Sequence, residues 1–217
     1  MPTSLRFALQ SLNTAFGLVV RTAPAPALGV GLLYLVLTRL LQPAGSFRFW
    51  HGRLATILVI LISQAILGIL VVGLARFFLS LSDGRSPRFL ELLDGFRAPW
   101  KALAGALFGW LVGMIALLTI LIPGSAPLAL LLLPGVLPLV MFGPFLIADG
   151  AVSHMLDAFL ESFRLGVTHY AKALAVAITV VVLVDIGGLL ILGPVISIPL
   201  CYTITAVAYR GLVTQPR

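Results

Sequence analysis

A single cysteine, Cys201, occurs in the 217 residues of this sequence. One thiol cannot form a disulfide framework, and no cluster of other metal-binding residues accompanies it. Because Cys201 lies inside a continuous apolar run, we expect a small packing residue there. The sequence therefore excludes a fold that is held together by disulfides.

Charged residues are also scarce, at 10%, whereas 60% of the residues are hydrophobic. A soluble domain of this length could not cover so much apolar surface. The apolar runs are continuous rather than alternating, which excludes the pattern of a membrane β-barrel. Only helices then satisfy the backbone in lipid, so the predicted fold class is an all-α integral membrane protein.

Six segments are long and apolar enough to be transmembrane helices, since about 20 residues cross a hydrocarbon core of about 30 Å. They lie at about 26–42, 55–80, 100–122, 127–148, 171–192 and 194–210. We predict a single membrane domain over residues 1–217. Polar residues between 10 and 14 interrupt the first apolar stretch, so we do not expect a cleaved signal peptide.

The basic residues favour one side of the membrane. If the N-terminus is inside, eleven of the 14 Lys and Arg residues are cytoplasmic and three, Arg39, Arg48 and Arg53, are not. Such an excess marks cytoplasmic loops, so we predict a multi-pass protein of a bacterial cytoplasmic (inner) membrane with both termini cytoplasmic. Basic edges against anionic lipid account for the net charge of +7, and we expect no nucleic-acid partner.

Three amphipathic segments precede pairs of spans. Each carries an apolar stripe with helical spacing. The stripes are Phe89, Leu93, Phe96 and Trp100; Leu5, Leu9, Leu12 and Phe16; and, more loosely, Met155, Phe159, Phe163 and Tyr170. Arg88, Glu91 and Asp94 are expected on the aqueous side of the segment that contains Phe89. A helix of this kind lies in the headgroup plane with its apolar stripe in the acyl boundary.

The resulting unit is an interfacial helix followed by a transmembrane hairpin. We predict three such pseudo-repeats, over about 4–80, 86–148 and 153–210, or three hairpins in all. The Ala98–Pro99 step is a plausible elbow between a surface helix and a span, because the residue before proline disfavours the helical conformation. The alternative is that similar amphipathic segments flank spans by chance in so apolar a chain.

The opening SLRFALQSLNTAFGLVVRTAPAPALGVGLLYL, the phrase IADGAVSHMLDAFLESFRLGVTHYAKAL and the ending GPVISIPLCYTITAVAYRGL carry a family resemblance. In these residue patterns the chain resembles uncharacterised bacterial inner-membrane proteins, similar in layout to the membrane domain attached to some glycerophosphodiester phosphodiesterases. The resemblance implies a six-span membrane protein without an established activity. It transfers no catalytic residue.

Gly105, Gly109 and Gly113 repeat at intervals of four and expose backbone along one helix face. Such a stripe lets another helix approach closely. We favour contact within the helix bundle over the alternative, a homo-oligomer seam.

Asp185 is the only acid well inside a predicted span. An intramembrane acid is a candidate polar site, although the glycines that follow it could end the helix and leave Asp185 in interfacial water. Prolines also interrupt the fourth and sixth spans, at 134, 138, 144, 194 and 199. Broken spans line substrate paths in some transporters, but tolerated kinks are the simpler interpretation.

His154, Asp157 and Glu161 share a helix face and could approach one metal ion. Arg164 on the same face would oppose a cation, and an ion pair between Glu161 and Arg164 is more economical. The sequence contains no phosphate-binding glycine loop or zinc-protease helix. We therefore predict no catalytic residue, no metal and no cofactor.

These features favour a non-catalytic membrane scaffold or accessory subunit. Its amphipathic helices and arginines would engage anionic membrane lipids, a membrane protein partner or a second copy of the chain. The alternative is a small transporter or permease subunit with a polar path near Asp185 and the proline-broken spans.

Overall fold

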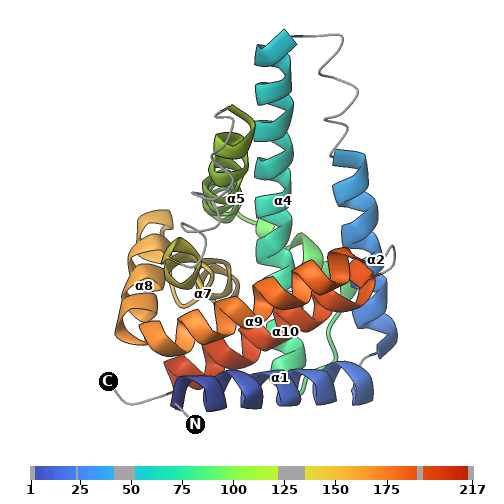
Figure 1. The fold of residues 1–217 in the computed structure, drawn as a ribbon, viewed down its shortest axis with the longest axis vertical. Coiled ribbons are helices and arrows are strands. Elements are labelled where there is room, and N and C mark those ends of the chain that lie inside the picture. The colour runs from blue at the N-terminus through green and yellow to red at the C-terminus, as the bar shows by residue number, and fades with distance from the viewer. Residues whose placement is uncertain (1–2, 23, 42–51, 122–134, 190–192, 215–217) are drawn as a thin grey trace.

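The computed structural model describes residues 3–22, 24–41, 52–121, 135–189 and 193–214. Within these residues every regular element is a helix, as predicted (Figure 1). The helices are α1 (Thr3–Arg21), α2 (Pro24–Leu41), α4 (Gly52–Ser82), the 3₁₀ helix η1 (Phe89–Phe96), α5 (Pro99–Leu121), α7 (Gly143–Asp149), α8 (Met155–Thr168), α9 (Tyr170–Gly188) and α10 (Gly193–Val213).

Three helices in this part of the chain are long and apolar enough to cross a membrane. They are Leu61–Ser82 of α4, Tyr170–Gly188 and Gly193–Val213, which match the predicted spans 55–80, 171–192 and 194–210. A fourth crossing would arise if Thr3–Arg21 and Pro24–Leu37, which meet at 102°, formed one broken span.

The predicted span 127–148 falls partly on residues 122–134, which lie outside the described residues. Its second half is a shorter apolar helix, Gly135–Asp149, which turns at 141–142 before α7 begins. Pro144 lies in the first turn of α7, where a missing N–H is tolerated. The hydroxyl of Ser162 donates a hydrogen bond of 2.9 Å to the carbonyl of Leu139 just before the turn. A neighbouring helix therefore supports this broken helix.

The long helix α4 is the axis around which the other helices are arranged (Figure 1). Both α5 and η1 pack along α4. The helices α9 and α10 run side by side and cross α4, so α4 is not parallel to these two candidate spans (Figure 1). At one end of α4, α1 packs against α9 and α10, and the start of α1 and the end of α10 lie at this edge (Figure 1).

Close contact between backbones joins α4 to α5. A Cβ on Gly105 would lie 2.8 Å from the carbonyl oxygen of Gly68, and a Cβ on Gly109 would collide with the carbonyl oxygen of Gln64. Gly105 and Gly109 are buried and face α4 of the same chain. The surroundings of Gly113 lie outside the described residues.

A second close approach joins α2 to α10 beside the proline of α10. Pro199 lies inside α10, and proline in a helix leaves the carbonyl four residues earlier without its donor. That carbonyl belongs to Val195, and it lies so close to α2 that Gly31 has no room for a Cβ against it. The position of α2 therefore depends on glycine at residue 31.

The main core lies where α4, α7 and α10 meet. Its large buried side chains include Phe77, Phe78, Phe142, Phe145 and Tyr209. The ring of Phe78 stacks on that of Tyr202 with centroids 5.8 Å apart. A smaller cluster, built mainly from alanines and β-branched residues, joins α1 to α9 and α10.

Replacement of Gly109 by alanine should destabilise the protein, because the added methyl group must displace the α4 backbone at Gln64. Overpacking of this kind costs about 1–3 kcal/mol. The matched control is Gly17→Ala in α1, where a Cβ meets nothing within 4 Å and helix propensity favours alanine by about 1 kcal/mol. Thermal unfolding in detergent measures both variants. Equal stability of the two variants would contradict the α4–α5 packing.

Candidate functional site

The N-terminal helix α1 exposes a row of large apolar residues and buries small ones, but Leu12 of the predicted row packs toward the bundle. Leu5, Leu9, Phe16 and Val20 are each at least two-fifths exposed, whereas Ala8, Ser11 and Ala15 are buried. The small residues lie at intervals of three and four and form the face that packs on α9 and α10. Close packing through small side chains leaves the apolar stripe on the outer surface.

The 3₁₀ helix η1 also exposes a row of large apolar residues, with two corrections to the prediction. Phe89, Leu90, Leu93 and Phe96 are about half exposed or more. Trp100 does not belong to this row, because α5 begins at Pro99 and turns Trp100 against the main core.

The second correction concerns Asp94, which is buried rather than on the aqueous side. Its carboxylate pairs with the ammonium of Lys101 at 2.8 Å and with Arg97 at 3.4 Å. The tighter 3₁₀ turn of η1 rotates Asp94 inward beside Gly95, where the backbone is pressed against Ile69.

In α8 the exposed row differs from the predicted one. Leu156, Leu160, Phe163 and Val167 are each more than half exposed. Met155 and Phe159 pack on the main core instead, because the ring of Phe159 stacks on Phe108 with centroids 4.1 Å apart. The inner face again consists of small residues, Ala158, Ser162 and Gly166.

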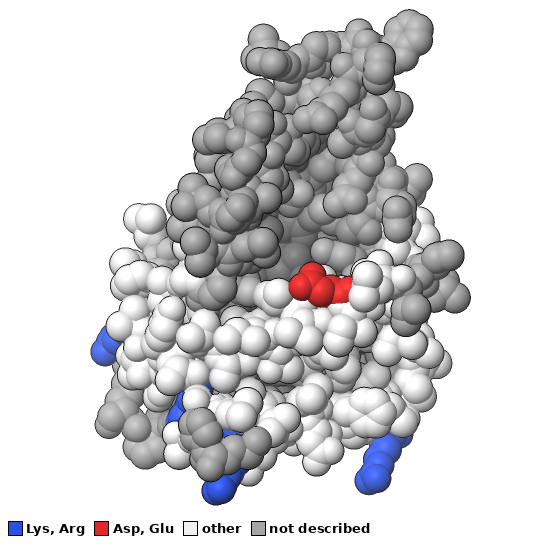
Figure 2. Space-filling model, in the orientation of Figure 1, with Lys and Arg blue, Asp and Glu red and all other residues white. Residues whose placement is uncertain are grey.

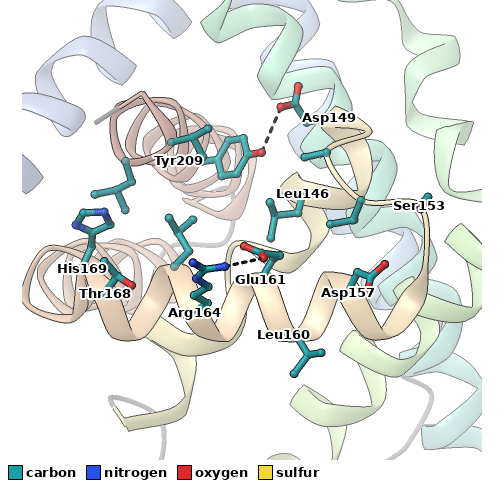
Figure 3. A pocket seen from close by; sticks show the side chains of 15 residues that line it. Leu146, Asp149, Ser153, Asp157, Leu160, Glu161, Arg164, Thr168, His169 and Tyr209 are labelled. Atoms are coloured by element: carbon teal, nitrogen blue, oxygen red, sulfur yellow. Dashed lines mark hydrogen bonds and ion pairs between the residues drawn. The ribbon is translucent and has the colours of Figure 1, made fainter. Parts of the chain in front are cut away.

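A polar cavity of about 690 Å³ lies between α7, α8 and α10. Asp157, Glu161 and Arg164 of α8 line one wall, and Asp149 and Tyr209 line the facing wall (Figure 3). Glu161 and Arg164 form an ion pair of 3.4 Å. Asp157 has no hydrogen-bonding or ionic partner among the described residues.

The facing wall is fixed by Arg210 near the end of α10. Its guanidinium binds Asp149 through two hydrogen bonds of 2.8 and 2.9 Å and Asp83 through two more of 2.9 and 2.8 Å. The hydroxyl of Tyr209 donates to Asp149 at 3.2 Å. Arg85 adds a further ion pair to Asp83. One arginine thus joins the C-terminal ends of α4, α7 and α10.

Outside the candidate spans, Asp83 and His169 at this edge have shifted pKa values. Partial burial raises the pKa of Asp83, but the hydrogen bonds and charges of Arg210 and Arg85 outweigh burial and hold it below its ordinary value of 3.8. Burial and the nearby charge of Lys172 lower the pKa of His169. At neutral pH Asp83 is therefore ionised and His169 is uncharged.

Basic side chains gather at the edge of the molecule that carries α1. On the face drawn in Figure 2, the Lys and Arg side chains lie toward this edge, whereas the acidic side chains lie farther from it. Lys172 at the start of α9 lies over the ring of Phe7 in α1, 5.5 Å from its centroid, so a cation–π contact ties α1 to this edge.

The other predicted site residues are not brought together. Asp185 is exposed on α9 and lines neither of the two cavities described. The second cavity, of about 370 Å³, lies among α4, α5, α9 and α10, and none of the described residues in its lining is charged. Among the described residues, no group of His, Cys, Asp and Glu could hold a metal ion.

Scans of this sequence and structure against protein-family models, curated proteins and solved structures found no match.

Substitution of Arg210 by lysine should destabilise the protein by about 2 kcal/mol, because an ammonium cannot form the forked hydrogen bonds to both aspartates. An Arg164→Lys variant is the control, since Arg164 makes one longer contact at the surface. Thermal unfolding in detergent measures both effects.

The same network predicts how stability depends on pH. Since the folded-state pKa of Asp83 is lowered, its contribution is present above the unfolded-state pKa of about 3.9 and is lost as pH falls through the folded-state value. Asp83→Asn should remove this part of the acid dependence. An identical acid transition in that variant would contradict the assignment.

Proposed function

We propose that this protein is a non-catalytic integral membrane scaffold or accessory subunit. In this proposal α1, η1 and α8 lie in the membrane interface, and basic residues at one edge engage anionic lipid or a partner protein. The supporting observation is that each of the three segments exposes a row of large apolar side chains.

Exposed rows of leucine and phenylalanine are unfavourable in water. Contiguous apolar patches on a protein surface are typical of membrane or protein contacts, and burial of one large apolar side chain contributes about 1.5–3 kcal/mol. In α1 and α8 polar residues occupy a separate exposed strip of the same helix. This division suits the boundary between headgroups and acyl chains better than it suits the hydrocarbon core.

The basic edge favours an anionic surface as the partner of these helices. Each Lys or Arg near an anionic leaflet contributes about 1 kcal/mol of attraction. Arg6, on α1, is exposed. The apolar row and the basic side chains of α1 could therefore engage the same membrane surface.

The fuller layout is part of the proposal: six spans in three hairpins, a bacterial inner membrane and both termini in the cytoplasm. The proposal also includes a relationship to the uncharacterised bacterial inner-membrane families. The start of α1 and the end of α10 lie at the same edge in Figure 1, which supports a common side for the two termini. Because α9 and α10 cross α4, these spans would have to tilt differently in the bilayer.

A small transporter remains the alternative. The proline-containing helices favour it, because broken helices can line a substrate path. It has less support, because Asp185 is exposed on α9 and the part of the interior cavity's lining that the structure describes contains no charged residue.

Spin labels on α8 test the interfacial position. In a Cys201→Ser background reconstituted in anionic vesicles, nitroxides at Leu156, Phe163 and Val167 should be reached by oxygen and shielded from an aqueous nickel chelate. Labels at Asp157, Arg164 and Thr168, which are also exposed, should show the reverse, because the helix lies at a boundary. Uniform aqueous accessibility of all six labels would refute the interfacial assignment.

Cysteine labelling tests the topology. Single cysteines at Ser86 and Ser153 should be protected from an impermeant maleimide in intact cells, because both positions are proposed to be cytoplasmic. Cysteines at Ser46 and Ser125, which lie outside the described residues, should react. Labelling of Ser86 as strong as that of Ser125 would exclude the six-span arrangement with cytoplasmic termini.

A further inference from the structure

The polar cavity between α7, α8 and α10 has the size and composition of a ligand site. Its volume of about 690 Å³ is within the range of about 300–1,000 Å³ that is typical of small-molecule sites. It presents an unpaired carboxylate, Asp157, and an exposed guanidinium, Arg164, on one helix. We propose that this cavity binds the head group of a membrane phospholipid that carries a primary amine. This inference rests on the proposed interfacial position of α8.

The charges of the cavity favour a ligand with both signs. Asp149 is already neutralised by Arg210 and Tyr209, so it is not available to a ligand. Asp157 can accept hydrogen bonds from an ammonium group. Arg164 contacts Glu161 through one nitrogen only, at 3.4 Å, so its other N–H groups can donate to a phosphate. A lipid phosphate without an amine would leave Asp157 unpaired beside a second negative charge.

The spacing of these two groups suits such a head group. Asp157 and Arg164 are seven residues apart, which is about 10 Å along a helix axis, and both face the cavity (Figure 3). An ethanolamine phosphate with one hydrogen bond of about 3 Å at each end bridges this distance, given the length of the arginine side chain.

The lining argues against a quaternary amine. A choline group has no N–H to donate and is bound by cages of aromatic faces. Tyr209 and His169 are the only aromatic residues among the described residues of the lining. The Tyr209 ring is also fully buried and packs against Phe142 and Phe145, so no cage is formed.

The position of the cavity argues for a lipid rather than a soluble metabolite. Leu160 lines the cavity and also belongs to the exposed apolar row of α8, with 67% of its surface exposed. A head group in the cavity can therefore continue into acyl chains along Leu156, Leu160 and Phe163 without leaving the protein surface.

Native mass spectrometry of the full-length protein in mild detergent tests this proposal. Phosphatidylethanolamine, phosphatidylcholine and phosphatidylglycerol with identical acyl chains are titrated separately. The wild-type protein should bind phosphatidylethanolamine about tenfold more tightly than phosphatidylcholine, as expected for one charge-assisted hydrogen bond. Equal binding of the three lipids would overturn the proposal.

Asp157→Asn should reduce binding of phosphatidylethanolamine about tenfold and leave phosphatidylcholine binding unchanged. Asp157→Lys should reverse the preference toward phosphatidylglycerol. The matched control is Asp185→Asn, because Asp185 is also an exposed helix carboxylate but lies outside the cavity. An equal loss in Asp157→Asn and Asp185→Asn would indicate a general surface effect and refute the site.

Two further readouts separate the possible failures. Soluble glycerophosphoethanolamine should displace the lipid only weakly, and displacement as effective as that by the intact lipid would overturn the lipid assignment. If the α8 spin labels are shielded from water but Asp157→Asn has no effect on lipid preference, only the head-group site is wrong. If the labels are uniformly exposed to water, the proposed interfacial function fails as well.

Discussion

The double ion pair of Arg210 is the interaction on which this edge of the structure depends. Its guanidinium holds Asp83 at the end of α4 and Asp149 at the end of α7 from a position near the end of α10. Arg76 of α4 adds a hydrogen bond of 3.0 Å to the carbonyl of Ala148 in the last turn of α7. These contacts join residues that are far apart in sequence. They also fix the wall of the polar cavity, because Asp149 and Tyr209 are held in place on one side while α8 supplies the other.

Small residues set the distances between the remaining helices. Gly68, Gly105 and Gly109 bring α4 and α5 into backbone contact, and Gly31 brings α2 against the carbonyl freed by Pro199. In lipid there is no hydrophobic force between helices, so close packing of this kind carries much of the stability. The same principle applies to the surface segments, where Ala8, Ser11 and Ala15 of α1 face the bundle. Helices α1 and α8 therefore both pack on the bundle through small residues and expose a row of large ones.

Periodicity and composition were sufficient to predict the helical class, three candidate spans, and most of the outward rows of α1 and η1, although Leu12 and Trp100 turn toward the interior. They failed in α8, which has two rows of apolar residues that could each face the interior. The contact between Phe159 and Phe108 decides which row is buried, and it is a tertiary contact. They also missed the burial of Asp94, since nothing in the local pattern shows that Lys101 lies beside it. The Arg210 network joins positions as much as 127 residues apart, and no single-sequence pattern contains such a pairing. The direction in which α9 and α10 cross α4 also depends on long-range contacts that no local sequence pattern contains.

The relation between the apolar rows and the polar cavity gives α8 a distinct place among the three amphipathic segments. In α1 the exposed row lies beside the helix face that packs on α9 and α10 through small residues. In α8 the exposed row instead borders a cavity with fixed charges on both walls. A surface that only adheres to the membrane needs an apolar row and basic residues, but not an unpaired carboxylate next to them. Anionic lipid would repel the carboxylate of Asp157, so its position beside Leu160 supports the proposed recognition of a positively charged group.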